Sequence, residues 1–210
     1  MARKLPATFY RRQDTLKVAR DLLGKKMVVP DETARRVSGR IVEVEAYLGV
    51  EDKAAHSYGG RFTERTKVMF GFGGTAYVFF VYGMYHQLNV VTGPDDSPHV
   101  VLIRAIEPLE NLEKMRERRG EMPDRNLTSG PGKLCIALGI DKSFYGEDLS
   151  GERIWLEDAP PAAGSEIASG PRIGIDYAEE YSKKPWRFWI VRNPFVSKVP
   201  MPRIAGARRT

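Results

Sequence analysis

The chain has 210 residues, of which 33 are lysine or arginine and 27 are aspartate or glutamate, giving a formal net charge of +6. This length suits one domain over residues 1–210. A basic balance favours a polyanionic partner, because phosphate contacts release counterions, although many proteins are mildly basic. Cys135 is the only cysteine, which excludes intramolecular disulfides and thiolate metal centres, and its apolar neighbours indicate a small buried side chain.

The N-terminal residues 1–6 lack the apolar run of a signal peptide, and no stretch reaches the length of a membrane span. We therefore expect a cytoplasmic protein with no membrane partner, associated with the nucleoid in a bacterium or placed in the nucleus in a eukaryote. Residues 203–210 contain three arginines and are expected to form a flexible basic tail.

The residue pattern predicts a helix, then a series of strands, and then two further helices along the chain. Asp14 is the expected cap of the first helix, and the segment 158–171, rich in alanine, glycine, serine and proline, is expected to be a surface loop. Several half-buried strands joined by hairpins favour an α+β domain, with a curved, mostly antiparallel sheet flanked by helices and a protruding β-hairpin. The predicted elements are helices at 14–23, 107–119 and 129–139, and strands at 25–29, 37–47, 77–82, 87–91 and 99–105.

Acidic residues gather on the strongest predicted strand and just after it. Alternation places Glu43, Glu45 and Tyr47 on one face. Two carboxylates are costly to bury without partners, so this face is solvated, ion-paired or functional. Two functional hypotheses stay open. The first is a metal site formed by the two carboxylates with Asp52 and His56, although the spacing of these residues fits no metal motif. The second is activation of water by one carboxylate during hydrolysis of a glycosidic bond.

Aromatic residues are concentrated in the predicted hairpin. The simplest interpretation is a sheet core, which we favour for Phe80. An aromatic residue at the hairpin tip could instead act as a wedge between base pairs, and aromatic faces stack well on flipped bases. The residues are Tyr77, Phe79, Phe80, Tyr82 and Tyr85.

Three further polar residues have two interpretations each. Asn89, after the hairpin turn, either pairs with backbone groups or senses a base edge. Arg104 ends an apolar strand, where a buried ion pair and phosphate binding are both open. Lys133 lies in the first turn of a predicted helix, where a helix N-terminus and a lysine together suit a phosphate contact.

An ordered set of motifs resembles one known family. The motifs are Gly39–Gly49 (GRIVEVEAYLG), Glu51–Asp52 with Ala54–Ser57, Gly74–Val78 running into Tyr82–Tyr85 and Asn89, Leu102–Glu110, Ser129–Leu134, Ile154–Glu157 and Lys184–Phe188. In this order and at this spacing they closely resemble the alkyladenine (3-methyladenine, or methylpurine) DNA glycosylases of the mammalian type. The resemblance spans nearly the whole chain, and the ordered set is specific although each piece is weak.

The resemblance implies a role for each matched residue. One departure is Phe79, where the family commonly has tyrosine opposite Tyr47 across the base; the stacking face is kept and the hydroxyl is lost. The implied roles are general base for Glu45, base pocket for Tyr47 and His56, duplex wedge for Tyr82, discrimination against guanine for Asn89, and contact with the DNA backbone for Arg104.

The activity implied by the resemblance is that of a monofunctional hydrolase. Such an enzyme flips alkylated or deaminated purines out of double-stranded DNA, hydrolyses the N-glycosidic bond and leaves an abasic site. We expect it to act as a monomer, without a cofactor or metal. The alternatives are a metal-dependent nuclease that uses the acidic cluster, and a non-catalytic nucleic-acid-binding domain.

Overall fold

The computed structural model describes residues 3–81 and 83–198, and in this part of the chain eight strands form one antiparallel sheet. The strands are β1 (Lys26–Pro30), β2 (Arg36–Leu48), β3 (Ala76–Val81), β4 (Tyr85–Thr92), β5 (His99–Glu110), β6 (Trp155–Glu157), β7 (Ile167–Gly170) and β8 (Arg187–Ile190). The α-helices are α1 (Ala7–Tyr10), α2 (Thr15–Leu22), α3 (Leu112–Arg119) and α4 (Pro131–Leu138). Short 3₁₀ helices lie at Gly49–Glu51, Tyr58–Gly60, Lys67–Phe70, Asp124–Asn126, Lys142–Phe144, Gly164–Glu166 and Asp176–Lys183.

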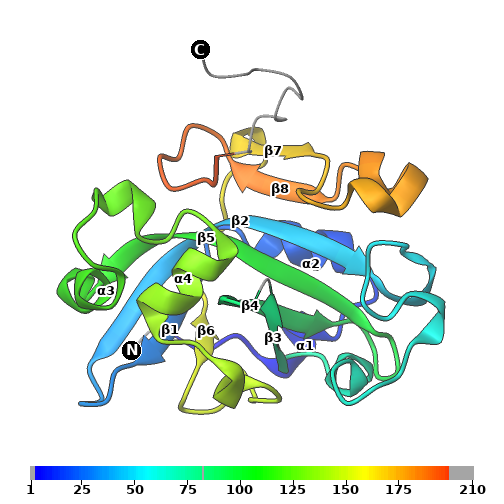
Figure 1. The fold of residues 1–210 in the computed structure, drawn as a ribbon, viewed down its shortest axis with the longest axis horizontal. Coiled ribbons are helices and arrows are strands. Elements are labelled where there is room, and N and C mark those ends of the chain that lie inside the picture. Colours follow the sequence, from blue (N-terminus) through cyan, green and yellow to red (C-terminus); the bar gives the residue numbers. More distant parts are fainter. Residues whose placement is uncertain (1–2, 82, 199–210) are drawn as a thin grey trace.

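The two longest strands, β2 and β5, form the centre of the sheet (Figure 1). The hydrogen-bonded order is β3-β4-β5-β2-β1-β6, and β8 joins β2 to β7. The first half of β2 pairs with β1, whereas Glu43–Glu45 of β2 pair with β8. The middle of β2 therefore lies between β5 and β8 in the sheet, and the side chains of residues 41–46 are buried.

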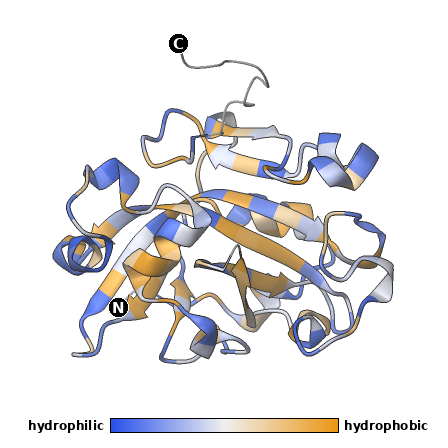
Figure 2. Cartoon of the chain, in the orientation of Figure 1, coloured by the Kyte–Doolittle hydropathy of each residue, from blue (hydrophilic) through white to orange (hydrophobic). Residues whose placement is uncertain are grey.

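Helices α2 and α4 pack against this sheet and bury its apolar side chains. In α2, Asp14 accepts a hydrogen bond from the Lys17 amide across 2.9 Å, as an N-cap does, and Val18 and Leu22 are fully buried. Helix α4 contributes Cys135 to the core, as the sequence predicts for a small buried side chain. Burial raises the pKa of this thiol to about 12. Figure 2 shows the apolar residues concentrated on the strands and on the helix faces that meet them.

The α+β class, the antiparallel sheet and most of the predicted elements are confirmed. Two of the predicted elements are wrong. The helix expected over 107–119 begins only at Leu112, because residues up to Glu110 extend β5 along the first half of β2. The loop expected over 158–171 contains β7, because Ile167–Gly170 find an antiparallel partner in β8. Both errors concern strands whose length depends on a partner that is distant in sequence.

Strands β3 and β4 form the predicted hairpin, and its tip extends beyond the part of β4, Asn89–Thr92, that pairs with β5. Gly83, in the turn, has a φ of 66°, which suits glycine, and Met84 beside it is exposed. Phe80 is 53% exposed and stacks on the ring of His86, so its assignment to the core is wrong. Tyr82 and the tail 203–210 lie outside the described residues.

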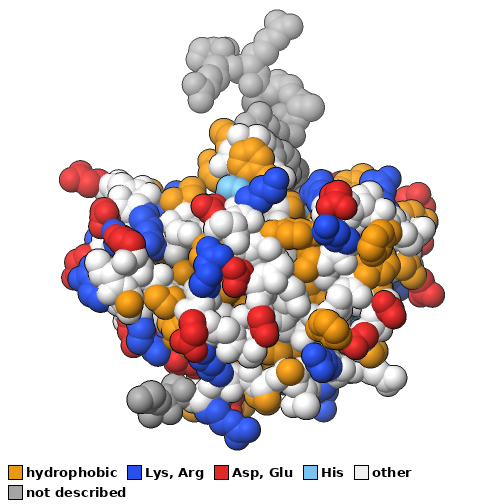
Figure 3. All heavy atoms as spheres, turned by 90° about the horizontal axis from the view of Figure 1, so that it is seen from below, with side chains coloured by type: hydrophobic (Ala, Val, Ile, Leu, Met, Phe, Trp, Pro, Cys, Tyr) orange, Lys and Arg blue, Asp and Glu red, His pale blue; other side chains and the backbone are white. Residues whose placement is uncertain are grey.

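The surface and the helix lengths bear on possible partners. The face in Figure 3 carries acidic, basic and hydrophobic side chains interspersed, so the net positive charge is not gathered there as one basic patch. Among the described residues, no helix combines the length and the apolar character that crossing a bilayer requires.

Candidate active site

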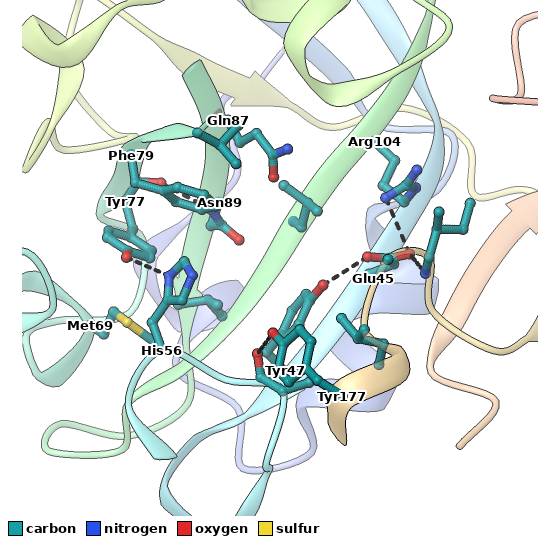
Figure 4. A pocket seen from close by; sticks show the side chains of 17 residues that line it. Glu45, Tyr47, His56, Met69, Tyr77, Phe79, Gln87, Asn89, Arg104 and Tyr177 are labelled. Atoms are coloured by element: carbon teal, nitrogen blue, oxygen red, sulfur yellow. Dashed lines mark hydrogen bonds and ion pairs between the residues drawn. The ribbon is translucent and has the colours of Figure 1, made fainter. Parts of the chain in front are cut away.

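A pocket opens where the hairpin faces the centre of the sheet (Figure 4). Glu45 and Tyr47 from β2 lie on one side, and Tyr77 and Phe79 from β3 lie on the other. The remaining lining residues come from β3, β4 and β5, from the 3₁₀ helices Lys67–Phe70 and Asp176–Lys183, and from the loops that hold residues 54–56 and 173–175. They are Ala54, His56, Met69, Val81, Gln87, Asn89, Val100, Leu102, Arg104, Ile173, Gly174, Ile175 and Tyr177.

Glu45 is a fully buried carboxylate that is held by three donors. The Ile173 amide donates to Oε1 across 2.7 Å, and the Tyr47 hydroxyl donates to Oε2 across 2.9 Å. An Arg104 nitrogen lies 3.3 Å from Oε1. Burial, followed by the charge of Glu45, raises the pKa of Tyr47 well above its ordinary value, so this hydroxyl stays protonated and keeps donating.

Glu43, two residues before Glu45, binds the same arginine, Arg104. Its Oε1 accepts from Nε of Arg104 across 3.0 Å and from Arg187 across 3.2 Å, and its Oε2 accepts from the Ser197 amide across 2.7 Å. Burial alone would lower the pKa of Arg104, but Glu45 and Glu43 outweigh that effect and raise it. The acidic face of β2 is therefore ion-paired rather than solvated.

An irregularity in the sheet accompanies this acidic pair. The register between β2 and β5 shifts between Ile41 and Glu43 and again between Glu43 and Val44. Such β-bulges are common near active sites, where they change the direction of a side chain. Here the irregularity coincides with the point at which both carboxylates reach Arg104.

His56 lies against the aromatic side of the pocket as a neutral imidazole. A nitrogen of Arg65 lies 3.2 Å from Nε2, and because a guanidinium can only donate, Nε2 accepts and Nδ1 carries the proton. Nδ1 then donates to the Tyr77 hydroxyl across 2.8 Å. Burial, with help from Arg65 and Arg61, lowers the pKa of His56 to about 4. The imidazole packs edge-on against Phe79, with ring centroids 4.6 Å apart.

Two amide side chains of β4 line the pocket next to the aromatic rings. Asn89 is buried and donates to the Tyr77 carbonyl across 3.2 Å, so it pairs with the backbone while it also faces the pocket. Gln87 is half-buried, and its amide points into the pocket in Figure 4. Sequence reasoning missed Gln87, although its position two residues before Asn89 puts it on the same strand face.

A second buried ion pair supports Tyr47 and was also missed. Arg172 donates to both carboxylate oxygens of Asp52, across 2.5 and 2.8 Å, and its Nη1 donates to the Ala46 carbonyl. The guanidinium carbon lies 4.5 Å from the centre of the Tyr47 ring. Arg172 therefore packs against the Tyr47 ring. The residue after it in the same loop, Ile173, donates to Glu45. No local pattern in the sequence indicates this contact, because it joins residues more than 100 positions apart.

The metal site considered for the acidic cluster is not assembled. Glu43 and Glu45 share Arg104, Asp52 is paired with an arginine of its own, and His56 binds Tyr77. Within residues 3–81 and 83–198, no three histidine, cysteine, aspartate or glutamate side chains are grouped as metal ligands would be. The four groups that are close in sequence therefore bind protein partners rather than one another.

Most of the predicted site residues converge on the pocket. Lys133, in the first turn of α4, is not one of the lining residues, and burial, together with Arg119 and Lys198, lowers its pKa. Tyr82 lies outside the described residues. The residues that do line the pocket are Glu45, Tyr47, His56, Phe79, Asn89 and Arg104.

Comparison with known proteins identifies the family. The family model described as methylpurine-DNA glycosylase matches residues 8–194. A protein of Bacillus cytotoxicus, named "Putative 3-methyladenine DNA glycosylase", is 52% identical over 93% of this chain and 100% of its own length. Proteins of Alkaliphilus oremlandii and Clostridium novyi with the same name are 52% and 49% identical, each over 93% of this chain and 99% of their own length. The chain therefore belongs to the methylpurine-DNA glycosylase family.

Proposed function

We propose that this protein hydrolyses the N-glycosidic bond of alkylated or deaminated purines in double-stranded DNA, with Glu45 activating the attacking water. The observation that carries the proposal is the fully buried Glu45 carboxylate in a pocket with aromatic walls. Family membership and the names of the relatives support the same reaction. The product is a free base and an abasic site.

A purine must leave the duplex to reach this carboxylate, because the glycosidic bond is not accessible in stacked DNA. Unstacking costs a few kcal/mol, and stacking on an aromatic side chain returns about 1–3 kcal/mol per base. Tyr47 and Phe79, which lie on opposite sides of the pocket, provide the stacking surfaces. We assign the wedge that fills the vacated space to Tyr82, which follows the last residue of β3 in the sequence.

The electrostatic character of the pocket suits a cationic base. Alkylation of a purine ring nitrogen leaves a positive charge, which the electron-rich faces of Tyr47 and Phe79 attract. A protonated imidazole would repel such a base. His56 is neutral near pH 7, because its pKa is lowered to about 4, so this repulsion is absent.

The chemistry at Glu45 follows that of glycoside hydrolysis. As the base departs, the sugar develops oxocarbenium character, which a nearby carboxylate stabilises, and the same carboxylate takes a proton from water. General base catalysis of this kind contributes about 10²–10⁴-fold. Within the described residues, the pocket is lined without lysine, which supports a monofunctional enzyme that forms no Schiff base.

Two basic residues are proposed to contact the DNA backbone. Arg104 lines the pocket next to Glu45, so a flipped nucleotide would bring its phosphate or sugar within reach of the guanidinium. Lys133 is proposed as a second phosphate contact, at the N-terminus of α4. Asn89 is proposed to reject guanine by steric conflict with the exocyclic amino group of that base.

We further propose that residues 1–210 form one domain, which acts as a monomer and without a cofactor. We place the protein where DNA is held, which is the cytoplasm with the nucleoid in a bacterium or the nucleus in a eukaryote.

The test is incubation of the protein with duplex DNA that contains 3-methyladenine, 7-methylguanine, hypoxanthine or ethenoadenine, in the presence of EDTA. A glycosylase releases free base, and the strand breaks only after alkali treatment. A nick that forms without alkali and disappears with EDTA would establish the metal-dependent nuclease instead. Binding without release of any base would establish the non-catalytic domain.

A further inference from the structure

The side chain of Gln87 lies in the base pocket at a position set by the hairpin. The register of β3 and β4 pairs Phe79 with Gln87 and Tyr77 with Asn89. Directly opposed residues in an antiparallel pair point to the same face, as do residues two apart on one strand. These four side chains therefore form one continuous patch, two aromatic rings beside two amides, and all four line the pocket.

The two amides differ in their hydrogen bonds. Asn89 already donates to the Tyr77 carbonyl. Gln87 makes no side-chain hydrogen bond to another described residue, although its side chain is half-buried and its amide points into the pocket. A half-buried amide that receives a ligand loses its water, and it must then find partners on that ligand. Gln87 is the pocket amide that offers both its donor and its acceptor to an incoming base.

We infer that Gln87 is a specificity residue that reads the 6-position edge of the flipped purine, an inference that rests on the proposed glycosylase function. A glutamine amide forms two parallel hydrogen bonds with an edge on which a donor and an acceptor are adjacent, as it does with the 6-amino group and N7 of adenine. 3-Methyladenine keeps its 6-amino group next to a ring nitrogen acceptor. It therefore satisfies both halves of the amide.

A base without a donor on this edge is disfavoured. In 1,N6-ethenoadenine the etheno bridge joins N1 to N6, so the edge presents acceptors only and the Gln87 carbonyl is left without a partner. A site that is built to hydrogen-bond its substrate rejects an analogue that lacks the matching group. Gln87 therefore shifts the substrate preference of this enzyme towards purines that present a donor beside an acceptor on this edge, as 3-methyladenine does, and away from ethenoadenine.

The test compares the wild-type protein with Gln87→Met, which keeps the length of the side chain and removes its hydrogen bonds. Single-turnover release of 3-methyladenine from methylated DNA, and of ethenoadenine from an oligonucleotide, is measured with saturating enzyme. We expect Gln87→Met to release 3-methyladenine about tenfold more slowly, which corresponds to one or two net hydrogen bonds, with ethenoadenine release unchanged or faster. Because His86 is the adjacent residue on β4 and borders a separate groove with Phe80, His86→Leu controls for disturbance of the hairpin.

The outcomes separate this inference from the proposed function. Release of 3-methyladenine by Gln87→Met at the wild-type rate overturns the role of Gln87, and so does equal slowing on both substrates. A loss of the same size in His86→Leu also overturns it, since the effect would then belong to the hairpin as a whole. If the wild-type protein releases no base from any of the substrates, the proposed function itself fails.

Discussion

The hydroxyl of Tyr47 donates a hydrogen bond across 2.9 Å to Oε2 of Glu45, which lies two residues earlier on the same strand. Strand alternation brings the two side chains to one face, and the burial of Glu45 keeps water from replacing this contact. The ring of Tyr47 also forms part of the pocket wall. One residue thus combines a stacking surface for the base with a donor that orients the carboxylate.

Replacement of the carboxylate at Glu45 removes the group that takes the proton from water. We expect Glu45→Gln to lower single-turnover base release at least about 100-fold, since general base catalysis contributes 10²–10⁴-fold. Affinity for lesion DNA, measured by fluorescence anisotropy, should stay close to that of the wild-type protein, because the stacking surfaces are untouched. Base release at more than a tenth of the wild-type rate would contradict the role of Glu45.

Tyr47→Phe separates the two roles of the tyrosine. The variant keeps the ring and loses the hydrogen bond to Glu45, and hydrogen bonds to charged groups are worth roughly 1.5–3 kcal/mol. We expect base release to slow by about 10- to 100-fold, while binding to lesion DNA changes little. Weaker binding with an unchanged rate of release would show that the hydroxyl serves recognition rather than the carboxylate.

Glu43 is predicted to be a structural residue, because it is fully buried and faces two arginines. Glu43→Ala leaves Arg104 and Arg187 without this partner, and breaking a buried ion pair typically costs about 3–5 kcal/mol. The free energy of unfolding from urea titration should fall by that amount. Glu64→Ala is the matched control, since Glu64 is 91% exposed and pairs with Lys67 at the surface, and it should leave the stability unchanged.

The stability of the protein should depend on pH through His56. Its pKa is about 4 in the folded protein and near 6.5 as a free side chain, so the unfolded state binds the proton more tightly. The stability due to neutral His56 is fully present above pH 6.5 and is lost as the pH falls towards 4. The pKa of His99 is lowered too, and this residue adds to the same window. Unfolding of wild type and His56→Gln, measured from pH 7 to pH 4.5, should show a smaller loss in the variant. Equal losses, or an imidazole that titrates near 6.5 by NMR, would contradict this prediction.

Local patterns in the sequence were sufficient for the elements whose signals lie within a few residues. The cap at Asp14, the aromatic strands of the hairpin and the helix that ends before Gly139 all follow from such signals. Patterns failed for β7 and for the last residues of β5, because a strand exists only as far as a partner continues beside it. They failed for Phe80 as well, since it lies towards the tip of the hairpin, beyond the part of β4 that pairs with β5, and is exposed there.

The sequence by itself determined the family, through ordered motifs, and it singled out Glu45 with the aromatic residues of the pocket. The tertiary structure decided how that carboxylate is held. Alternation along a strand tells which side chains share a face, but it does not tell whether that face meets water or arginines from distant strands. Arg104 and the amide of Ile173 reach Glu45 only after β5 and the loop after β7 have packed against β2. In the same packed arrangement the hydroxyl of Tyr47 donates to Glu45. A buried carboxylate needs such donors, because a buried charge without partners is costly.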